Sequence, residues 1–376
     1  MTPTIREAAG NLLVVGLGGT ELNGMERAWL RLVRPGGIIL FKRNVADTEQ
    51  TRAVLDEATG LSHAHAMRCV DVEGGTVNRL REALAPLLSA QAVAAAARRV
   101  SKPVLAREHG ELIGRAVKAF GFNTTLAPVL DLGLREAADI MGSRTAGATA
   151  AEVVAYARPM FEALRAQGVA GCGKHFPGLG GASGDTHLLT PSITRSWKQL
   201  WSEDLLPYRE LHSAMPLVMI NHAAYPDTAG KDRPASVSRF WMTTVLRRRI
   251  GYRGIIFSDD FEMGGILKYL PIEEAVVSAV RAGMDVIEIC HSPELILRAY
   301  EALVSEAEQS RSFRALLYSR SEAVLRKRKQ LYRKPAARPL SRTHLMALRD
   351  RMLRFNDAIA ANEVPAARSA TAVEVS

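Results

Sequence analysis

Apolar residues in this chain gather in short runs, which are separated by segments with helical periodicity. Runs of this kind, bounded by Gly or acidic residues, are typical of strands that are covered on both faces. Eight of them predict strands, at residues 12–17, 37–41, 67–71, 123–129, 169–174, 217–221, 254–258 and 284–290. The intervening segments 151–167 and 272–282 each end just before a Gly, which is typical of a helix C-terminus.

Strands that alternate with helices predict an α/β fold, and eight of them predict a (β/α)8 TIM barrel. An open doubly wound sheet would usually carry a Gly-rich phosphate turn after its first strand, and residues 16–19 match that turn only weakly. We expect a TIM-barrel domain at residues 1–333, a basic C-terminal helical extension at 334–363 and a disordered tail at 364–376. In the extension, Ser341 would cap an amphipathic helix whose apolar side packs on the barrel or on a second subunit.

The composition is that of a globular protein, with 47% apolar and 23% charged residues. A net charge of +10 raises the question of a nucleic-acid partner, but residues 311–354 alone contain fourteen Arg or Lys and two acids. The rest of the chain is therefore close to neutral. We read the basic run 326–329 as a solvated helix face, and no interleaved aromatics accompany it. No nucleic-acid partner is expected.

Three cysteines are too few for a disulfide framework, and the sequence shows neither a secretory leader nor an apolar run long enough to cross a bilayer. We therefore expect a cytoplasmic protein with no membrane partner. Its oligomeric state remains open.

Polar residues follow six of the eight predicted strands. In a TIM barrel the carboxyl ends of the strands meet at one face, where the chemistry takes place. Two aspartates, Asp259 and Asp260, end the seventh run, and capping of the next helix would use only one of them. The candidate hydrogen-bond partners for a hydroxyl-rich sugar are Asp71, Arg79, Arg144, Lys174 and His175.

Glycoside cleavage needs a carboxylate nucleophile and a group that protonates the leaving oxygen. Asp259 can be the nucleophile, and His187 can be the proton donor, because Asp185 lies two residues away and can orient its imidazole. The alternative for Asp185 and His187 is an ordinary turn.

A metal site is the rival chemistry. The pair His63 and His65 precedes the third strand, at the opposite end from the polar cluster, and no local spacing supports His175, His222 or His291 as ligands. No metal and no cofactor are expected.

Residues 245–259 contain two aliphatics, a basic residue, a charged residue two positions on, then Gly, three apolar residues and Ser258-Asp259. In this motif, and in segments 37–44, 123–131 and 234–239, the chain resembles glycoside hydrolase family three. The likeness is to the single-domain bacterial β-N-acetylglucosaminidases of cell-wall recycling, and it covers about residues 10–295. It implies Asp259, not Asp260, as the nucleophile.

The resemblance also implies that Asp71, Arg79, Arg144 and the Lys174-His175 pair contact the terminal sugar. The chain differs from the commonest family pattern in the loop after residue 178, where Leu179 and Gly181 stand in place of a polar His and Asp. The number of residues from the start of this loop to His187 is the same as in the family pattern. Two-domain relatives take the acid/base from a second domain, for which this chain has no room, so His187 is again the candidate.

We therefore expect a glycoside hydrolase, a retaining exo-β-N-acetylglucosaminidase, that removes terminal N-acetylglucosamine from a small carbohydrate. The family implies muropeptide fragments and peptidoglycan recycling. The alternatives are a family-three β-glucosidase or other β-glycosidase or phosphorylase on the same fold, and a non-catalytic sugar-binding barrel.

Overall fold

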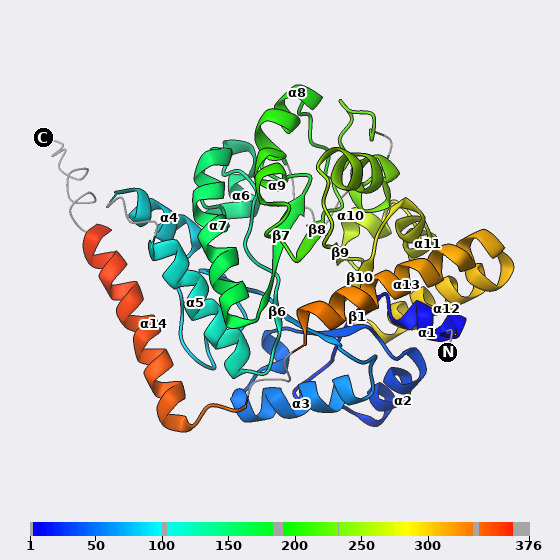
Figure 1. Cartoon of the computed structure of the whole chain (residues 1–376), viewed down its shortest axis with the longest axis horizontal. Coiled ribbons are helices and arrows are strands. Elements are labelled where there is room, and N and C mark those ends of the chain that lie inside the picture. Colours follow the sequence, from blue (N-terminus) through cyan, green and yellow to red (C-terminus); the bar gives the residue numbers. More distant parts are fainter. Residues whose placement is uncertain (1–2, 100–103, 183–190, 232, 334–337, 364–376) are drawn as a thin grey trace, which may run out of the picture.

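The computed structural model describes residues 3–99, 104–182, 191–231, 233–333 and 338–363, and it contains a closed barrel of eight parallel strands (Figure 1). The predicted (β/α)8 barrel is confirmed, and every predicted strand coincides with an observed one. Around the barrel the strand order is β1, β10, β9, β8, β7, β6, β3, β2. The barrel strands are β1 Leu13–Gly16, β2 Gly37–Leu40, β3 Met67–Val70, β6 Thr124–Thr125, β7 Ala170–Phe176, β8 Leu217–Ile220, β9 Ile255–Asp260 and β10 Val286–Ile289.

A small antiparallel pair, β4 Val72–Gly74 and β5 Val77–Asn78, follows β3 directly. The α-helices surround the barrel, most of them between consecutive strands (Figure 1). They are α1 Ile5–Gly10, α2 Gly24–Val33, α3 Thr48–Gly60, α4 Ala90–Arg99, α5 Val104–Ala119, α6 Ala138–Met141, α7 Ala150–Gln167, α8 Trp197–Gln199, α9 Leu206–Leu211, α10 Gly264–Leu267, α11 Ile272–Ala282, α12 Pro293–Gln309, α13 Arg311–Leu331 and α14 Arg342–Glu363.

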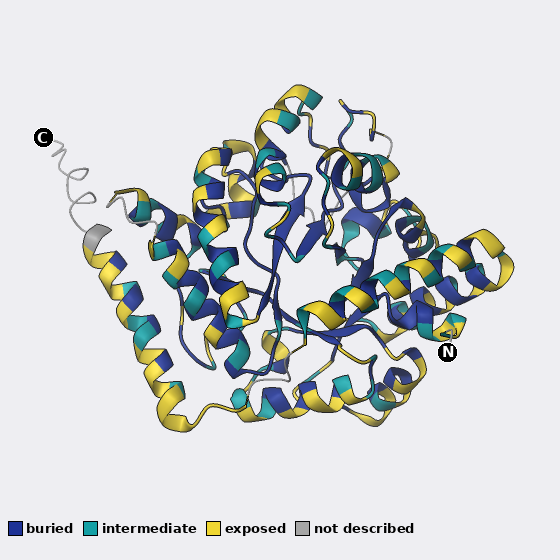
Figure 2. Ribbon diagram, in the orientation of Figure 1, coloured by how far each residue is buried: buried dark blue, intermediate teal, exposed yellow. Residues whose placement is uncertain are grey.

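The apolar runs are buried on both sides, as continuous runs in a parallel barrel must be. Residues of β1, β2, β8 and β10 are all buried, and the helices expose only their outer faces (Figure 2). Helix α7 ends at Gly168, which has a left-handed φ of 72°. This confirms the C-terminus predicted there, because only Gly adopts that conformation without steric cost.

Helix α13 crosses the amino-terminal end of the barrel, opposite the ends where the predicted site residues lie. Arg328 donates to the carbonyl oxygen of Gly36, just before β2, and to the side chain of Asn11, just before β1. Lys327 Nζ donates to the carbonyl oxygen of Gly254, just before β9, at 2.5 Å. The Tyr332 hydroxyl lies 2.7 Å from Thr124 Oγ1 on β6. Helix α13 and its C-cap residue Tyr332 therefore tie together the starts of four strands.

The interpretation of run 326–329 as a solvated helix face was wrong for two of its members. Arg328 is fully buried and Lys327 is half-buried, whereas Arg326 and Lys329 are exposed. Buried and exposed residues occur together in this run because one side of α13 faces the strand starts, whose carbonyl oxygens need hydrogen-bond donors. The positive charge of this segment is thus partly structural.

Removal of the Arg328 side chain tests this account of α13. We expect Arg328→Met to lower the free energy of unfolding by about 3 kcal/mol, since it leaves buried acceptors on Gly36 and Asn11 without a donor. Urea unfolding would measure the change. Arg326→Met, at an exposed position of the same helix, should change stability by less than about 0.5 kcal/mol. Equal effects of the two substitutions would contradict a structural role for Arg328.

Helix α14 packs against α4 and α5 on the outside of the barrel (Figure 1). The Ser341 hydroxyl accepts from the backbone N–H of His344 at 3.3 Å, which confirms the predicted cap. The predicted apolar side faces the protein, with four residues buried and one partly buried. These are Leu345, Leu348, Met352, Phe355 and Ile359. The proposed domain boundaries stay a prediction, and residues 364–376 lie outside the described residues.

The three cysteines are free thiols in the barrel interior, as the sequence indicated. In the described part of the chain, no helix combines the length and apolarity that crossing a bilayer requires.

Candidate active site

A pocket of about 1000 Å³ opens at the carboxyl ends of the barrel strands. Six predicted site residues line it together. They are Asp71, Arg79, Arg144, Lys174, His175 and Asp259. They come from four separate stretches of the chain, and the closed barrel brings them to one mouth. The remaining two, Asp185 and His187, lie outside the described residues.

Lys174, in β7, is the centre of the charge network in this pocket. Its Nζ lies 2.9 Å from Asp71 Oδ1 and 2.6 Å from Glu73 Oε1. Burial lowers the pKa of Lys174, but the charges of Asp71 and Glu73 outweigh it and hold the pKa above the usual value. Lys174 is therefore a permanent cation that holds the two carboxylates side by side.

Glu73, in β4, connects Lys174 to Arg144. Arg144 donates to both of its carboxylate oxygens, at 2.9 and 2.8 Å. Burial alone would raise the pKa of Glu73, but the two cations hold it well below its usual range. Such a bidentate pair fixes the guanidinium plane, so Arg144 presents its remaining donors in one direction.

His175 follows Lys174 in β7, and both side chains line the pocket; the peptide bond between them is cis. His175 Nδ1 lies 2.6 Å from Asp131 Oδ2, and the other oxygen of Asp131 accepts from the backbone N–H of Leu179 at 2.7 Å. A carboxylate on Nδ1 fixes the imidazole orientation, with Nε2 turned toward Arg144 at 3.4 Å. Asp131 thus holds both the histidine and the start of the unusual loop, through the backbone of Leu179 and not its side chain.

Asp259 lies at the end of β9, in the pocket wall. Burial raises the pKa of its carboxyl, but His175, His222 and the backbone N–H of Asp260 outweigh that effect, so the pKa is below its usual value. The carboxylate is therefore ionised at neutral pH and is available as a nucleophile. His222 is held in turn by Ser236 Oγ at 2.7 Å and by the carbonyl oxygen of Asp260 at 3.0 Å.

The motif at residues 245–259 has a direct structural explanation. Val245 and Leu246 are buried against the barrel. Arg247 pairs with Asp285, just before β10, and donates to the carbonyl oxygen of Gly254 at 2.8 Å. The motif therefore places β9 relative to its neighbour, and with it the position of Asp259.

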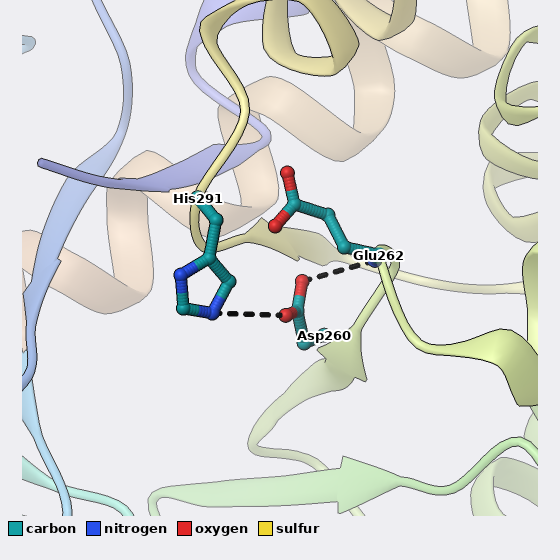
Figure 3. A group of neighbouring side chains, drawn as sticks. All are labelled: Asp260, Glu262 and His291. Atoms are coloured by element: carbon teal, nitrogen blue, oxygen red, sulfur yellow. Dashed lines mark hydrogen bonds and ion pairs between the residues drawn. The ribbon is translucent and has the colours of Figure 1, made fainter. Parts of the chain in front are cut away.

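The Asp260 side chain points toward Glu262 and His291 (Figure 3). Asp260 Oδ1 accepts from the backbone N–H of Glu262 at 3.0 Å, and its Oδ2 lies 3.9 Å from His291 Nε2. One ligand atom from each of the three side chains lies within 4.8 Å of the others, so they form a group in which a metal ion could be held. Glu262 already accepts from the backbone N–H of Ser292 at 2.6 Å, and His291 is stacked on Phe41. Hydrogen bonding and stacking thus account for this group, and the expected absence of a metal stays a prediction.

The protonation of Asp260 makes stability depend on pH. Burial and the charges of Glu262 and Asp259 raise its pKa to about 7, whereas in the unfolded chain it should be about 3.9. Between these two values folding takes up a proton, so the contribution of Asp260 to stability falls as the pH rises from about 4 to 7.

Asp260→Asn cannot ionise and keeps an oxygen for the Glu262 N–H. We expect it to gain stability over the native protein across that range, by about 2 to 4 kcal/mol at pH 7. Urea unfolding at several pH values would measure the gain. Asp227→Asn, at an exposed aspartate, is the control: its free energy of unfolding should differ from that of the native protein by the same amount at every pH. Parallel curves for Asp260→Asn and the native protein would contradict the raised pKa.

With this geometry known, comparison with other proteins identifies the family. Residues 4–326 match the glycosyl hydrolase family 3 N-terminal domain. The chain belongs to glycosyl hydrolase family 3.

Sequence relatives within the family agree with this assignment. A β-hexosaminidase from Xanthomonas oryzae pv. oryzae is 36% identical over 296 residues, which cover 78% of this chain and 87% of the relative.

Solved structures agree as well. A family 3 β-N-acetylglucosaminidase from Paenibacillus sp. str. FPU-7 has a TM-score of 0.84 at 28% identity, with 94% of this chain and 69% of that one covered. NagZ from Neisseria gonorrhoeae has a TM-score of 0.70 at 29% identity, with 83% of this chain and 97% of that one covered. The chain is therefore an enzyme, a glycoside hydrolase, and the resemblance stated from its motifs is confirmed.

Sequence reasoning missed Glu288, which lines the pocket, and two carboxylates that hold lining residues in place: Glu73, and Asp131 as a partner of His175. Glu73 stands two residues after Asp71, in a segment that the sequence already singled out, so its proximity was a usable signal. Glu288 is an acid inside an otherwise apolar strand, which is the clearest signal that was overlooked.

Proposed function

We propose that this glycoside hydrolase is a retaining exo-β-N-acetylglucosaminidase with Asp259 as its nucleophile. The observation that carries the proposal is the ionised Asp259 carboxylate in a pocket where Lys174 is paired with Asp71 and Glu73, and His175 with Asp131. Asp71, Arg79, Arg144, Lys174 and His175 would hold the hydroxyl and acetamido groups of the terminal sugar. The β-hexosaminidase and β-N-acetylglucosaminidase relatives support an N-acetyl sugar over glucose.

In the first step Asp259 attacks the anomeric carbon while His187 protonates the leaving oxygen, which gives a covalent glycosyl-aspartate. In the second step the same histidine takes a proton from water, and the water displaces Asp259 from the sugar. Asp185 would orient the His187 imidazole. Two inversions leave the product with the β configuration of the substrate.

Release of nitrophenol from nitrophenyl β-N-acetylglucosaminide and from the matching β-glucoside tests the choice of sugar. We expect turnover of the N-acetyl sugar well above that of the glucoside. Preference for the glucoside would make the enzyme a β-glucosidase. Turnover that depends on added phosphate and yields a sugar phosphate would make it a phosphorylase.

We further propose muropeptide fragments, met in the cytoplasm during peptidoglycan recycling, as the natural substrate. The family resemblance alone supports this part. Incubation with purified peptidoglycan fragments should release free N-acetylglucosamine from their non-reducing ends, as measured by mass spectrometry. Cleavage of simple N-acetylglucosaminides without any cleavage of these fragments would argue for another source of the sugar.

A further inference from the structure

Glu288 is a glutamate in the wall of the barrel, in the middle of β10. Its side chain is only 2% exposed, yet it lines the active-site pocket, as does Cys290 two residues later. Alternate residues of a strand face the same side, so β10 turns Glu288 and Cys290 toward the pocket and Ile287 and Ile289 away from it. Glu288 is paired in register with Asp260 of β9, so the two side chains start at the same height in the barrel.

The Glu288 carboxyl has an oxygen that is buried without a partner. Within the described part of the chain, its Oε1 makes no hydrogen bond. Three buried carboxylates in and beside the pocket differ in this respect, because Asp71, Glu73 and Asp131 are each paired with a cation or a histidine. A buried polar atom without a hydrogen bond costs stability, and such atoms often have a functional reason.

We propose that the Glu288 carboxyl forms a hydrogen bond with a hydroxyl group of the sugar bound in this pocket, and that it selects for sugars that carry this hydroxyl. The proposal rests on the proposed function, since it places the glycosyl unit beside Asp259. A hydroxyl group suits the site because it can both donate to and accept from a carboxyl.

The electrostatic surroundings support a neutral ligand group at this position. Burial and the negative charges of Asp71, Asp260 and Asp259 hold the pKa of Glu288 well above its usual value, although Lys174 opposes them. A neutral carboxyl can donate through its O–H and accept through its C=O, like the sugar hydroxyl that it would meet. The same surroundings place Glu288 within electrostatic reach of both Asp71 and Asp259.

The test combines substitutions at Glu288 with sugars that lack single hydroxyls. Native enzyme, Glu288→Leu and Glu288→Gln are assayed on nitrophenyl β-N-acetylglucosaminide and on its 3-deoxy, 4-deoxy and 6-deoxy forms. We expect Glu288→Leu to lower kcat/KM on the complete sugar roughly tenfold to hundredfold, the size of one hydrogen bond to a polar substrate group. Glu288→Gln keeps a donor and an acceptor and should lose much less.

The deoxy sugars separate contact with the substrate from a structural role. On the one deoxy sugar that lacks the partner hydroxyl, Glu288→Leu should lower kcat/KM by no more than about threefold, because the hydrogen bond is already absent. If the substitution distorted the pocket instead, kcat/KM would fall by the same factor on every sugar. Glu294→Leu, at an exposed glutamate near the start of α12, is the matched control and should leave all four values unchanged.

Two results would overturn the proposal: no loss in Glu288→Leu, or an equal loss on all four sugars. Failure of the proposed function is distinguishable, since the native enzyme would then favour the glucoside. The same comparison with deoxy β-glucosides would then decide the role of Glu288.

Discussion

Replacing Asp259 by Ala should lower kcat by roughly 10⁴-fold, or about 5.5 kcal/mol of activation free energy. In the proposed mechanism this carboxylate forms the covalent bond of the first step, and its lowered pKa keeps it ionised in the pocket wall. KM should change far less than kcat, because the sugar contacts proposed for Asp71, Lys174 and Arg144 would remain. Nitrophenol release with the N-acetyl sugar measures both constants.

Asp260→Asn is the matched control for this experiment, because it removes the neighbouring carboxyl. Asp260 points toward Glu262 and His291 and should lose much less activity than Asp259 (Figure 3). A small anion such as azide should restore turnover to Asp259→Ala and yield a glycosyl azide of inverted configuration, since only one displacement then takes place. Comparable losses in the two variants, without rescue, would refute the assignment of Asp259.

Glu73→Gln should give the second large effect, on stability and on activity together. Glu73 faces Lys174 at 2.6 Å and accepts two hydrogen bonds from Arg144, and all three groups are largely buried. Removal of one charge leaves the cations uncompensated, which should cost about 3 to 5 kcal/mol of unfolding free energy. Arg144 and Lys174 should also shift, and a displacement of about 1 Å can lower kcat/KM roughly hundredfold. Urea unfolding and nitrophenol release would measure the two losses.

The pH dependence distinguishes a lost charge from lost packing. The pKa of Glu73 is below its usual value in the folded protein, so its contribution to stability is complete above the unfolded value of about 4.3 and declines as the pH falls below it. The difference between native protein and Glu73→Gln should therefore narrow in acid. Glu82→Gln, at an exposed glutamate paired with Lys42, should change little at any pH. A constant difference down to pH 2 would show that the charge of Glu73 is not what matters.

The sequence by itself determined the architecture and six of the residues that line the pocket. Each strand was recognisable because a parallel barrel strand is buried on both faces and must be apolar throughout, which is a local property. The polar residues after the strands could be predicted to lie together, since the carboxyl ends of all strands in a parallel barrel lie at one face. Asp259 could be predicted as the nucleophile because the family motif before it is continuous in the chain, and that motif lies against Asp285 and the start of β9.

The tertiary structure decided which charges are paired. Lys174 meets Asp71 and Arg144 meets Glu73 across 103 and 71 residues, and no local pattern encodes such distances. Arg328 seemed to be one of several solvated basic residues, yet its acceptors lie about 300 residues away at the strand starts. Burial and pairing depend on the whole barrel, because a charge is stable inside a protein only where the fold supplies its partner. Glu288 stands out in the sequence as an acid in an apolar strand, but only the closed barrel shows that it lines the pocket with an oxygen that has no partner among the described residues.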